Sequence, residues 1–566
     1  RFAMSYFLNS LNTKGDYRPN FLDGQGIFTY TPGINKDRPY FRLTERPDGT
    51  MDTLYFANEK LKFTTFVALT RNRYLFEPSG RETTFGTIQK AFRLRVAFEG
   101  REISNYSTGL GAFMVTHRPH ARLRLDYILT GFRTEEAELF DVEGGYLLGE
   151  VNTSFGSQEF NESQFDRGIG TQFQHARNYL TAGVASAQVK GEWTTDNRSR
   201  HKFYFGLSTR YQQIDDALKE YAALDSAGYL VDENGLFGLD EFIRGATRLN
   251  SILINGYFQY QIQMGKQGAS SLVLGSRAGY YDLTGDWMIS PRIQYVYDLS
   301  RRIGGPNMRL RLASGVYQQP PFYREFRRFD GSLNPDLRAQ TSLHFIGGLD
   351  YQFPAWGRTF KLFSEAYYKH LGNIIPYEVQ NVRVRYYPDE MATGYAYGFD
   401  ARLNGQFIKG VDSWVSLGLL KTQEDIVGDD RAFVPRPADQ RITFAMYFQD
   451  EMPINPTYKV HVSYIYNSGM RFGPPGIFEN RTAFSFPAYH RVDLGFSKLI
   501  SFKGAAEKQH RYGMESLWAT VEIFNLLQRE NTVSYTWIKD LDNNVFAVNN
   551  FLSARLLNAR VILSFR

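Results

Sequence analysis

The sequence contains no cysteine. This absence excludes a disulfide scaffold and thiolate metal sites, and it fits an envelope protein that folds without oxidation. Long apolar runs are also missing, since no stretch approaches the roughly 18 apolar residues that indicate a transmembrane helix. Charge of one sign is scarce: the net charge is +6 over 566 residues. Because the basic residues are dispersed, nothing indicates a nucleic-acid partner.

Domain boundaries and catalytic motifs are missing as well. A soluble chain of 566 residues would suggest several domains, yet neither a Pro- or Ser-rich linker nor a shift in composition divides this one. Two of the nine histidines, His117 and His120, share a short turn, but two ligands without a third make a poor metal site. No nucleophile–base–carboxylate set stands out, so we do not expect an enzyme.

What the sequence does contain is alternation with a period of two. One face of the final segment carries Leu557, Ala559, Val561, Leu563 and Phe565, and the other carries Asn558, Arg560 and Ser564 together with Ile562. The same pattern recurs about twenty times, in segments of roughly ten residues, which is the signature of a transmembrane β-barrel. Aromatic residues make up 16% of the chain, and Tyr and Trp suit a membrane–water interface. An aromatic-rich soluble β-protein is the alternative.

The alternation predicts an all-β fold: one closed antiparallel barrel spanning residues 1–566. The expected strand cores are 2–10, 21–30, 61–70, 90–98, 105–117, 120–131, 178–190, 199–211, 247–264, 269–281, 286–298, 306–318, 339–353, 357–370, 391–407, 411–423, 439–449, 456–467, 488–500, 515–527 and 552–565. Segment 143–151 also alternates, but we assign it to an outer loop. Because bacterial barrels have even strand numbers, we expect about 22 strands, with one more upstream of residue 1.

Short and long connections alternate along the chain. The short ones include 117–120, 265–268, 353–357 and 408–410. The long ones cover 31–60, 132–177, 212–246, 319–338, 371–390, 424–438, 468–487 and 528–551. Outer-membrane barrels have short periplasmic turns and long extracellular loops, so we expect the long connections outside and the C-terminus in the periplasm. A lumen of 22 strands is too wide for its own side chains to fill, and known examples are plugged.

Arginines alternate with apolar residues on many of these strands. A charged side chain facing lipid at the bilayer midplane costs about 2–4 kcal/mol, so the apolar residues should face lipid and the arginines the lumen. The predicted lumen set is Arg93, Arg95, Arg122, Arg124, Arg309, Arg311, Arg491 and Arg560. We expect these arginines to pair with lumen acids such as Asp126 and Asp493 or with a plug. Guidance of an anionic substrate is the alternative.

Four stretches carry a family resemblance. They are Ser290–Arg292 with Leu312–Pro321, Ala366–Lys369 with Gly394–Asp400, Glu522–Leu527 with Asn531 and Ser534–Trp537, and the closing strand Arg555–Phe565. In their order and spacing they resemble the TonB-dependent outer-membrane receptors, in particular the Bacteroidota type. The resemblance implies active uptake of a scarce or bulky nutrient, energised through TonB, and an N-terminal plug domain with a TonB-contacting segment.

The plug and the TonB-contacting segment are not recognisable in this sequence, so we expect them upstream of Arg1. Residues Arg1–Tyr6 read as a strand and not as a signal peptide. The resemblance implies a location in the bacterial outer membrane. It also implies as partners the TonB complex, the plug domain and outer-membrane lipid, and a surface lipoprotein is a further candidate partner.

Two kinds of loop could bind ligands. Segment 317–328 is dense in aromatic residues and arginines, the types that dominate binding hot spots, and its candidate ligand contacts are Tyr317, Phe322, Tyr323, Arg324 and Arg327. A structural clamp is equally consistent. Loop 212–246 holds eight acidic residues, and Ile214, Leu218, Tyr221 and Leu224 suggest a short helix inside it. Calcium prefers such oxygen clusters, but the spacing matches no EF-hand, so we expect solvated loops and no cofactor, with Ca²⁺ as the alternative.

Three other functions stay open. A passive porin would need fewer strands and no plug. A protein-export or assembly translocon could also use a large barrel with a partner plug. An outer-membrane hydrolase would need a catalytic triad at the barrel rim. The leading interpretation is an active importer whose substrate the sequence does not identify.

Overall fold

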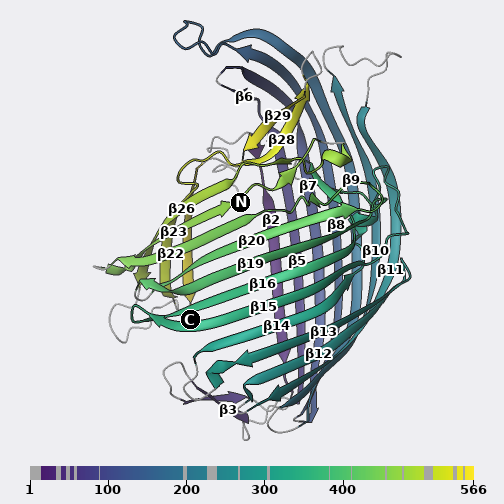
Figure 1. Cartoon of the computed structure of the whole chain (residues 1–566), viewed down its shortest axis with the longest axis vertical. Coiled ribbons are helices and arrows are strands. Elements are labelled where there is room, and N and C mark those ends of the chain that lie inside the picture. The colour runs from purple at the N-terminus through teal and green to yellow at the C-terminus, as the bar shows by residue number, and fades with distance from the viewer. Residues whose placement is uncertain are drawn as a thin grey trace.

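A computed structural model describes residues 15–32, 40–45, 51–56, 60–87, 89–120, 122–195, 200–225, 239–265, 268–301, 306–380, 383–408, 411–452, 455–474, 477–501, 514–539, 545–551 and 555–565. The strand expected at residues 2–10 lies outside this part of the chain. One antiparallel sheet of 22 strands curls around the molecule, which confirms the predicted all-β barrel fold and strand number (Figure 1). No helix in the described part of the chain is long and apolar enough to span a membrane.

The main strands neighbour one another in chain order. They are β2 (Asn20–Tyr30), β5 (Leu61–Pro78), β7 (Ala91–His120), β8 (Leu123–Val151), β9 (Ser163–Thr194), β10 (His201–Asp225), β11 (Leu239–Met264), β12 (Ser270–Tyr281), β13 (Asp286–Asp298), β14 (Met308–Gln319), β15 (Gln340–Ala355), β16 (Arg358–Ile374), β19 (Ala392–Ile408), β20 (Val411–Ile426), β22 (Ile442–Met452), β23 (Asn455–Asn467), β26 (Tyr489–Ser501), β27 (Met514–Phe524) and β30 (Leu556–Phe565). Three short strands complete the sheet: β1 (Gly15–Tyr17) on β5, β6 (Arg81–Gly86) on β7, and β21 (Val434–Pro435) on β20.

Four separate hairpins lie in the connections between these strands. They are β3–β4 (Tyr40–Glu45 and Met51–Phe56), β17–β18 (Tyr377–Gln380 and Arg383–Tyr386), β24–β25 (Arg471–Phe472 and Phe484–Ser485) and β28–β29 (Thr532–Lys539 and Val545–Phe551). One short helix, α2 (Tyr323–Phe326), follows β14.

The sheet has one end with short connections, which we call the turn end, and one with long connections, the loop end. The predicted short connections all lie at the turn end, as expected. The expectation for segment 31–60 is wrong. Its hairpin β3–β4 joins β2 to β5 at the turn end, opposite the hairpin β28–β29 (Figure 1).

The cause is that the two strands expected at 90–98 and 105–117 form a single strand, β7. Its pairing with β8 continues without a break from Ala91 to His117. Gly100 makes this possible, because it adopts a φ of 108° and a Cβ there would collide with the carbonyl oxygen of Asp141. Since no turn separates 90–98 from 105–117, every connection before residue 90 lies at the end of the sheet opposite to the one expected.

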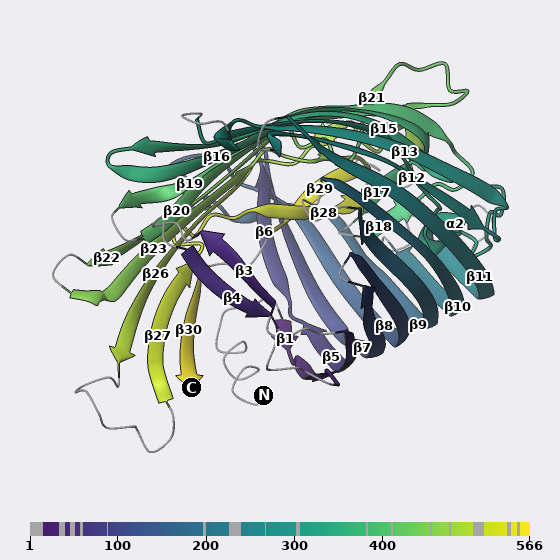
Figure 2. The same ribbon diagram turned by 90° about the horizontal axis from the view of Figure 1, so that it is seen from below.

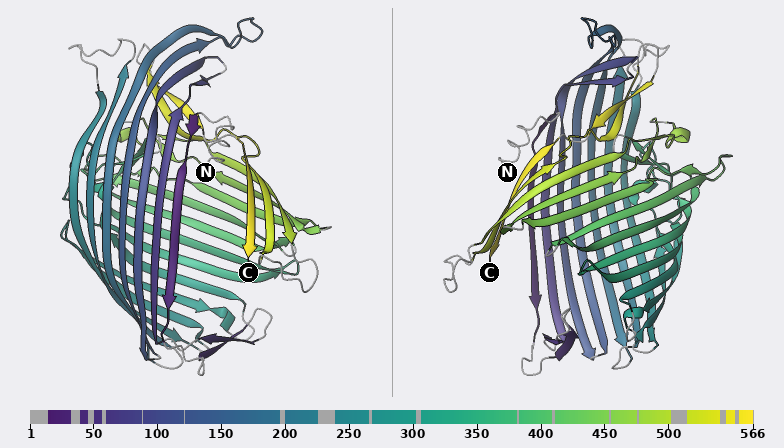
Figure 3. Two further views of the ribbon diagram at one scale, coloured as in Figure 1. Left: turned by 180° about the vertical axis from the view of Figure 1, so that it is seen from behind. Right: turned by 60° about the vertical axis from the view of Figure 1, so that its left-hand side comes forward.

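The sheet has two walls of different height (Figure 3). The tall wall is β7 to β11, with 25 to 32 residues in each strand. The short wall is β12 to β30, whose main strands have 10 to 17 residues. A membrane-spanning strand needs only about 9–11 residues, so the strands of the tall wall are long enough to continue well beyond a bilayer.

Because the strands of the tall wall are so long, two segments expected as loops are wrong. Most of 132–177 belongs to β8 and β9, including segment 143–151, and most of the described part of 212–246 belongs to β10 and β11. The short helix expected around Leu218 is therefore a stretch of β10. Its residues pair with β11 throughout and with β9 on both sides of Leu218 and Lys219, and these ladders of backbone hydrogen bonds favour the strand over an isolated helical turn.

Residues directly opposite one another in the sheet share a face, so the register identifies both faces. Val460 lies opposite Phe496 and Val462 opposite Leu494, which continues an apolar outer face across β23 and β26. The polar residues of these strands share the other, inner face. There Lys459 lies opposite Ser497, His461 opposite Gly495 and Ser463 opposite Asp493. The expected division of apolar and charged residues is confirmed for the short wall.

Among the described residues, β2 and β30 have no partner on their free edges, and the two edges face each other across a gap (Figure 2). Every step from β2 to β30 through the main strands is antiparallel, so these two edge strands run in the same direction. They cannot pair with each other as antiparallel neighbours. An odd number of further strands would be needed to close the ring, and the strand expected at 2–10 would satisfy that parity.

Candidate functional site

Most of the predicted lumen arginines bind carboxylates on the inner face. The pairs are Arg124 with Asp126 (3.1 Å), Arg309 with Asp298 (3.1 Å), Arg311 with Glu365 (3.1 Å), Arg491 with Asp493 (2.7 Å) and Arg560 with Glu522 (3.7 Å). Arg122 lies at the turn end and donates a hydrogen bond to the carbonyl oxygen of Thr195 (3.0 Å). These contacts favour a structural role, in which each buried or half-buried charge has a partner.

Arg93 and Arg95 are placed differently from the expectation. Both bind Glu82 of β6, at 3.1 and 2.9 Å, on the outer face near the top of the tall wall. The apolar residues between them face inward, where Leu94 and Leu148 of β8 pack against Val548 of β29 in a fully buried cluster. The alternation is therefore correct, but the faces are exchanged.

The faces are exchanged because Arg93 and Arg95 lie beyond the apolar outer face of the tall wall, toward the loop end. On the outer face of β8, the continuous run of apolar residues ends at Leu129, and above it follow Arg133 and Glu135, which bind each other at 2.9 Å and are largely exposed. Arg93 and Arg95 lie still farther toward the loop end. A polar outer face costs nothing in water, whereas the apolar inner face is covered by the hairpin β28–β29.

The segment after β14 folds back onto the inner face of the tall wall. The Tyr323 hydroxyl donates to Asp216 of β10 (2.7 Å), and the Arg327 guanidinium binds the same carboxylate (3.1 Å). Asp216 is buried at 7% exposure, and the pKa of Tyr323 is raised by burial and by Asp216, so the hydroxyl stays a donor. Farther along, Gly331 lies against Gly245 of β11 so closely that a Cβ at either position would have to displace the other backbone.

The five candidate ligand contacts thus divide into three groups. Tyr323 and Arg327 hold the segment in place, as a clamp would. Phe322 and Arg324 point into solvent, with Phe322 63% exposed. Tyr317 is still part of β14 on the inner face, where its ring stacks on His344 (4.4 Å between centroids).

The loops of the short wall are tied to this segment and to one another. Arg328 binds Asp389 with hydrogen bonds of 2.8 and 2.9 Å, which links segment 319–338 to segment 371–390. The ring of Tyr387 then contacts that of Phe478, at 4.5 Å between centroids. Phe472, in the same loop as Phe478, stacks on Tyr535 of the hairpin β28–β29 at 4.6 Å between centroids, so these contacts form one connected cover at the loop end.

A buried ion network fixes the far side of this cover. Glu424 at the end of β20 is completely buried and binds Arg436 (3.0 Å) and Arg481 (2.8 Å). Asp439, also completely buried, binds Arg441 (2.9 Å) and accepts a hydrogen bond from the backbone N–H of Thr422. Since breaking one partner of a buried pair leaves an uncompensated charge, these contacts hold the loops firmly.

A cavity of about 510 Å³ lies on the inner face below segment 318–323. Its wall is polar, with serines, amides and two arginines, Arg210 of β10 and Arg277 of β12. The sequence interpretation did not single out either arginine. The signal that could have found them is the alternation of their strands, which places both on the face opposite exposed apolar residues such as Leu207 and Leu274.

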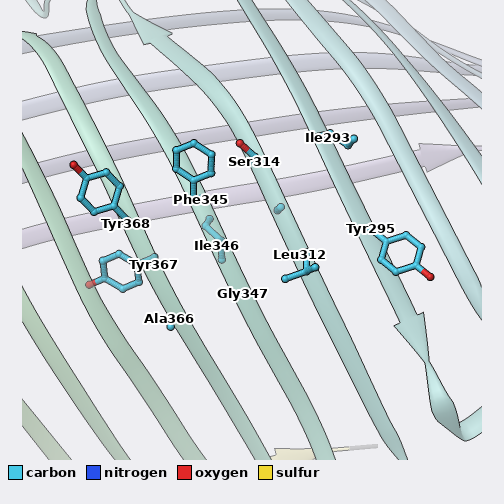
Figure 4. A pocket seen from close by; sticks show the side chains of 11 residues that line it. Ile293, Tyr295, Leu312, Ser314, Phe345, Ile346, Gly347, Ala366, Tyr367 and Tyr368 are labelled. Atoms are coloured by element: carbon cyan, nitrogen blue, oxygen red, sulfur yellow. The ribbon is translucent and has the colours of Figure 1, made fainter.

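The outer face carries shallower apolar grooves. In one of about 570 Å³, Leu312, Phe345 and Tyr368 project from neighbouring strands around Gly347 and Ala366 (Figure 4). This groove lies within the apolar face of the short wall, so its shape fits contact with lipid tails. Within the described ranges, no group of three or more His, Asp or Glu residues could hold a metal ion.

Comparison with known proteins agrees with this architecture. The family described as "TonB dependent receptor-like, beta-barrel" matches residues 55–526. No curated protein matches the chain at the sequence level.

Solved structures also resemble the chain. The ferric-catecholate import receptor Fiu of Escherichia coli has a TM-score of 0.52 at 11% identity, over 98% of this chain and 82% of its own. The copper transporter OprC (0.48, 10% identity, 91% and 82% coverage) and a mutant of the ferric enterobactin receptor of Pseudomonas aeruginosa (0.46, 10%, 96% and 80%) are similar as well. At these identities the likeness concerns the fold alone, and only the first score is high enough to support it. Because the family match covers most of its length, the chain belongs to the TonB-dependent receptor-like β-barrels of the outer membrane.

Proposed function

We propose that this protein is an active importer of the outer membrane, energised through TonB, which takes up a nutrient at its loop end. The family to which the chain belongs supports this proposal, since its members are receptors and transporters, not enzymes. The observation that carries it is the connected cover of loops: Tyr323 and Arg327 on Asp216, Arg328 on Asp389, and the ion network around Glu424. A passive porin would instead need an open mouth.

Substrate enters from the loop end, where Phe322 and Arg324 are exposed beside the cavity below segment 318–323, and both are candidate substrate contacts. Tyr323 and Arg327 position them. The plug domain and the TonB complex are the partners that transport requires. The turn end, with the C-terminus of β30, then faces the periplasm.

The test is uptake in cells. In strains that express this receptor as the sole route for its nutrient, deletion of TonB or collapse of the proton gradient should abolish growth on that nutrient at limiting concentration. The control is a strain with TonB intact but without this receptor, which should show the same defect. Entry that persists without TonB would favour a passive porin.

A further inference from the structure

The inner face of the short wall carries a row of basic side chains above the layer of ion pairs. Its members are Arg277 of β12, Arg292 of β13, His344 of β15 and Lys369 of β16, and we call them the basic ridge. The register sets the row: Arg292 lies opposite Gly315 of β14, which lies opposite His344, which lies opposite Lys369. Arg277 lies opposite Ser290, two residues before Arg292, so the two arginines are diagonal neighbours about 7–8 Å apart.

Local packing holds the ridge together. Gly315 leaves room for the Arg292 side chain, since a Cβ there would lie 2.9 Å from the Cγ of Arg292. The Arg292 guanidinium lies over the ring of Tyr317 at 4.3 Å, and the same ring stacks on His344. A cation placed over an aromatic face keeps its charge and much of its hydrogen-bonding capacity. The ridge therefore presents donors and not neutralised pairs.

The ridge differs from the arginines of the ion-pair layer in having no carboxylate partner. Arg309 and Arg311, nearer the turn end, bind Asp298 and Glu365. Within the part of the chain that the structure describes, neither Arg277, Arg292 nor Lys369 forms an ion pair, and the same holds for Arg210 across the cavity. Asp400 is nearer the turn end than Lys369 and does not bind it directly.

The ridge lies beside the cavity of about 510 Å³, because Arg277 and Arg210 both line it. Guanidinium groups bind carboxylate and phosphate oxygens in pairs, so guanidinium groups without an ion-pair partner favour a ligand with anionic oxygens.

We propose that the basic ridge, together with Arg210, binds an oxyanion, a carboxylate or phosphate group, at the junction of the lumen and the loop-end cover. This proposal rests on the proposed import function, for which it names the substrate class: an anionic nutrient. The same chemistry could come from a carboxylate of the plug, which would fill the lumen.

The experiment uses the complete protein purified from outer membranes, with citrate and inorganic phosphate as probes in isothermal titration at low salt. The variants are Arg277→Gln, Arg292→Gln and the double variant, with Arg292→Lys as the conservative replacement. Arg248→Gln is the matched control, since Arg248 lies on the outer face of the tall wall and binds Asp215 at 2.8 Å. Heat-modifiable migration in gels confirms that every variant is folded.

If the oxyanion belongs to the substrate, citrate binds the complete protein, each Arg→Gln change weakens it about tenfold, as the loss of one charge-assisted hydrogen bond predicts, and Arg292→Lys restores part of the affinity. If it belongs to the plug, citrate does not bind, but the double variant makes the plug more sensitive to protease. Both outcomes support the oxyanion site and distinguish its sources. Unchanged citrate binding together with unchanged plug protection in the double variant overturns it.

These measurements need neither TonB nor a proton gradient. A failure of TonB-dependent uptake would therefore overturn the proposed function and leave the binding result standing. A failure of oxyanion binding would remove the substrate class and leave active import untouched.

Discussion

The tall wall and the short wall are built from the same alternating pattern, yet they use its faces differently. In the short wall, Leu310 and Leu312 face outward, while Arg309 and Arg311 bind carboxylates on the inner face. Near the top of the tall wall, Leu94 faces inward and its arginine neighbours face outward. A period of two specifies a strand, and the surroundings at each height decide which face is apolar.

The walls also differ in how they are stabilised. At about 3.4 Å per residue, the 29 residues of β8 would extend roughly 100 Å, far more than a bilayer requires. Above the apolar band, lipid no longer covers the outer face, and the inner face gains its own core from the hairpin β28–β29. The tall wall is thus a membrane strand at its base and an ordinary water-soluble sheet at its top.

The largest expected effect comes from placing a charge on the outer face of each wall, once within the apolar face of the short wall and once above the apolar residues of the tall wall. Leu312→Arg, on the outer face of the short wall, should cost about 2–4 kcal/mol of barrel stability and lower the amount of folded protein sharply. Leu139→Arg, on the outer face of β8 beyond Arg133, should change stability by less than about 1 kcal/mol. Urea unfolding in lipid vesicles measures both. An equally large loss for Leu139→Arg would place the top of the tall wall in lipid.

Sequence alone predicted most of this framework. Each expected strand from 21–30 to 552–565 corresponds to a strand or to part of one, and the expected short turns are where the structure has them. The alternation does not reveal how far each strand continues beyond the membrane. No local signal distinguishes a polar residue on a water-exposed strand from one in a loop, so the upper parts of β8 to β11 read as loops.

The candidate site was less accessible to sequence reasoning. The clamp role of Tyr323 and Arg327 depends on Asp216, which is more than a hundred residues away in the chain. The basic ridge depends on register across β12 to β16, because Arg292 and Lys369 become neighbours of His344 only when three connections have fixed the pairing. Residue types and alternation were visible in the sequence, but these partners were not.

A core deletion in the tall wall should give an effect of comparable size. Leu148 is completely buried between β7 and the hairpin β28–β29, so Leu148→Ala should cost about 2–5 kcal/mol. The loss should be local, and hydrogen exchange should accelerate in Thr532–Lys539 and Val545–Phe551 before it changes in the short wall. Leu139→Ala on the outer face is the control. Uniform acceleration over both walls would show that they do not unfold separately.

The next prediction concerns the contact of Tyr323 and Arg327 with Asp216, which joins the segment after β14 to the tall wall. Tyr323→Phe removes the hydrogen bond to Asp216 but keeps the ring and leaves Arg327 on the same carboxylate. The expected cost is about 1.5–3 kcal/mol, because the lost bond involves a charged acceptor. Protease cleavage within Tyr323–Asn334 should become faster, while Phe322→Leu, at an exposed position, should leave the rate unchanged. Equal protection in Tyr323→Phe would mean that Arg327 alone holds the segment.

The smallest expected effect concerns the ion pairs on the outer face of the tall wall. Asp141, above the apolar band, binds Arg177 and His175, each at 2.6 Å, and the hydrogen bond from Arg177 is the main reason that its pKa lies below the ordinary value. A carboxyl whose pKa is lower in the folded protein stabilises the fold above its unfolded pKa of about 3.9, and this contribution is lost as the pH falls through the folded pKa.

Because these side chains are partly exposed, the contribution should stay below about 1 kcal/mol. The hydrogen-exchange protection factor around Asp141, which corrects for the pH dependence of the intrinsic exchange rate, should therefore be constant between about pH 7 and pH 5 and fall slightly only in stronger acid. Asp141→Asn should already show the small loss between about pH 7 and pH 5. A loss of several kcal/mol in Asp141→Asn would show that the outer face of the tall wall is buried against a partner and not in water.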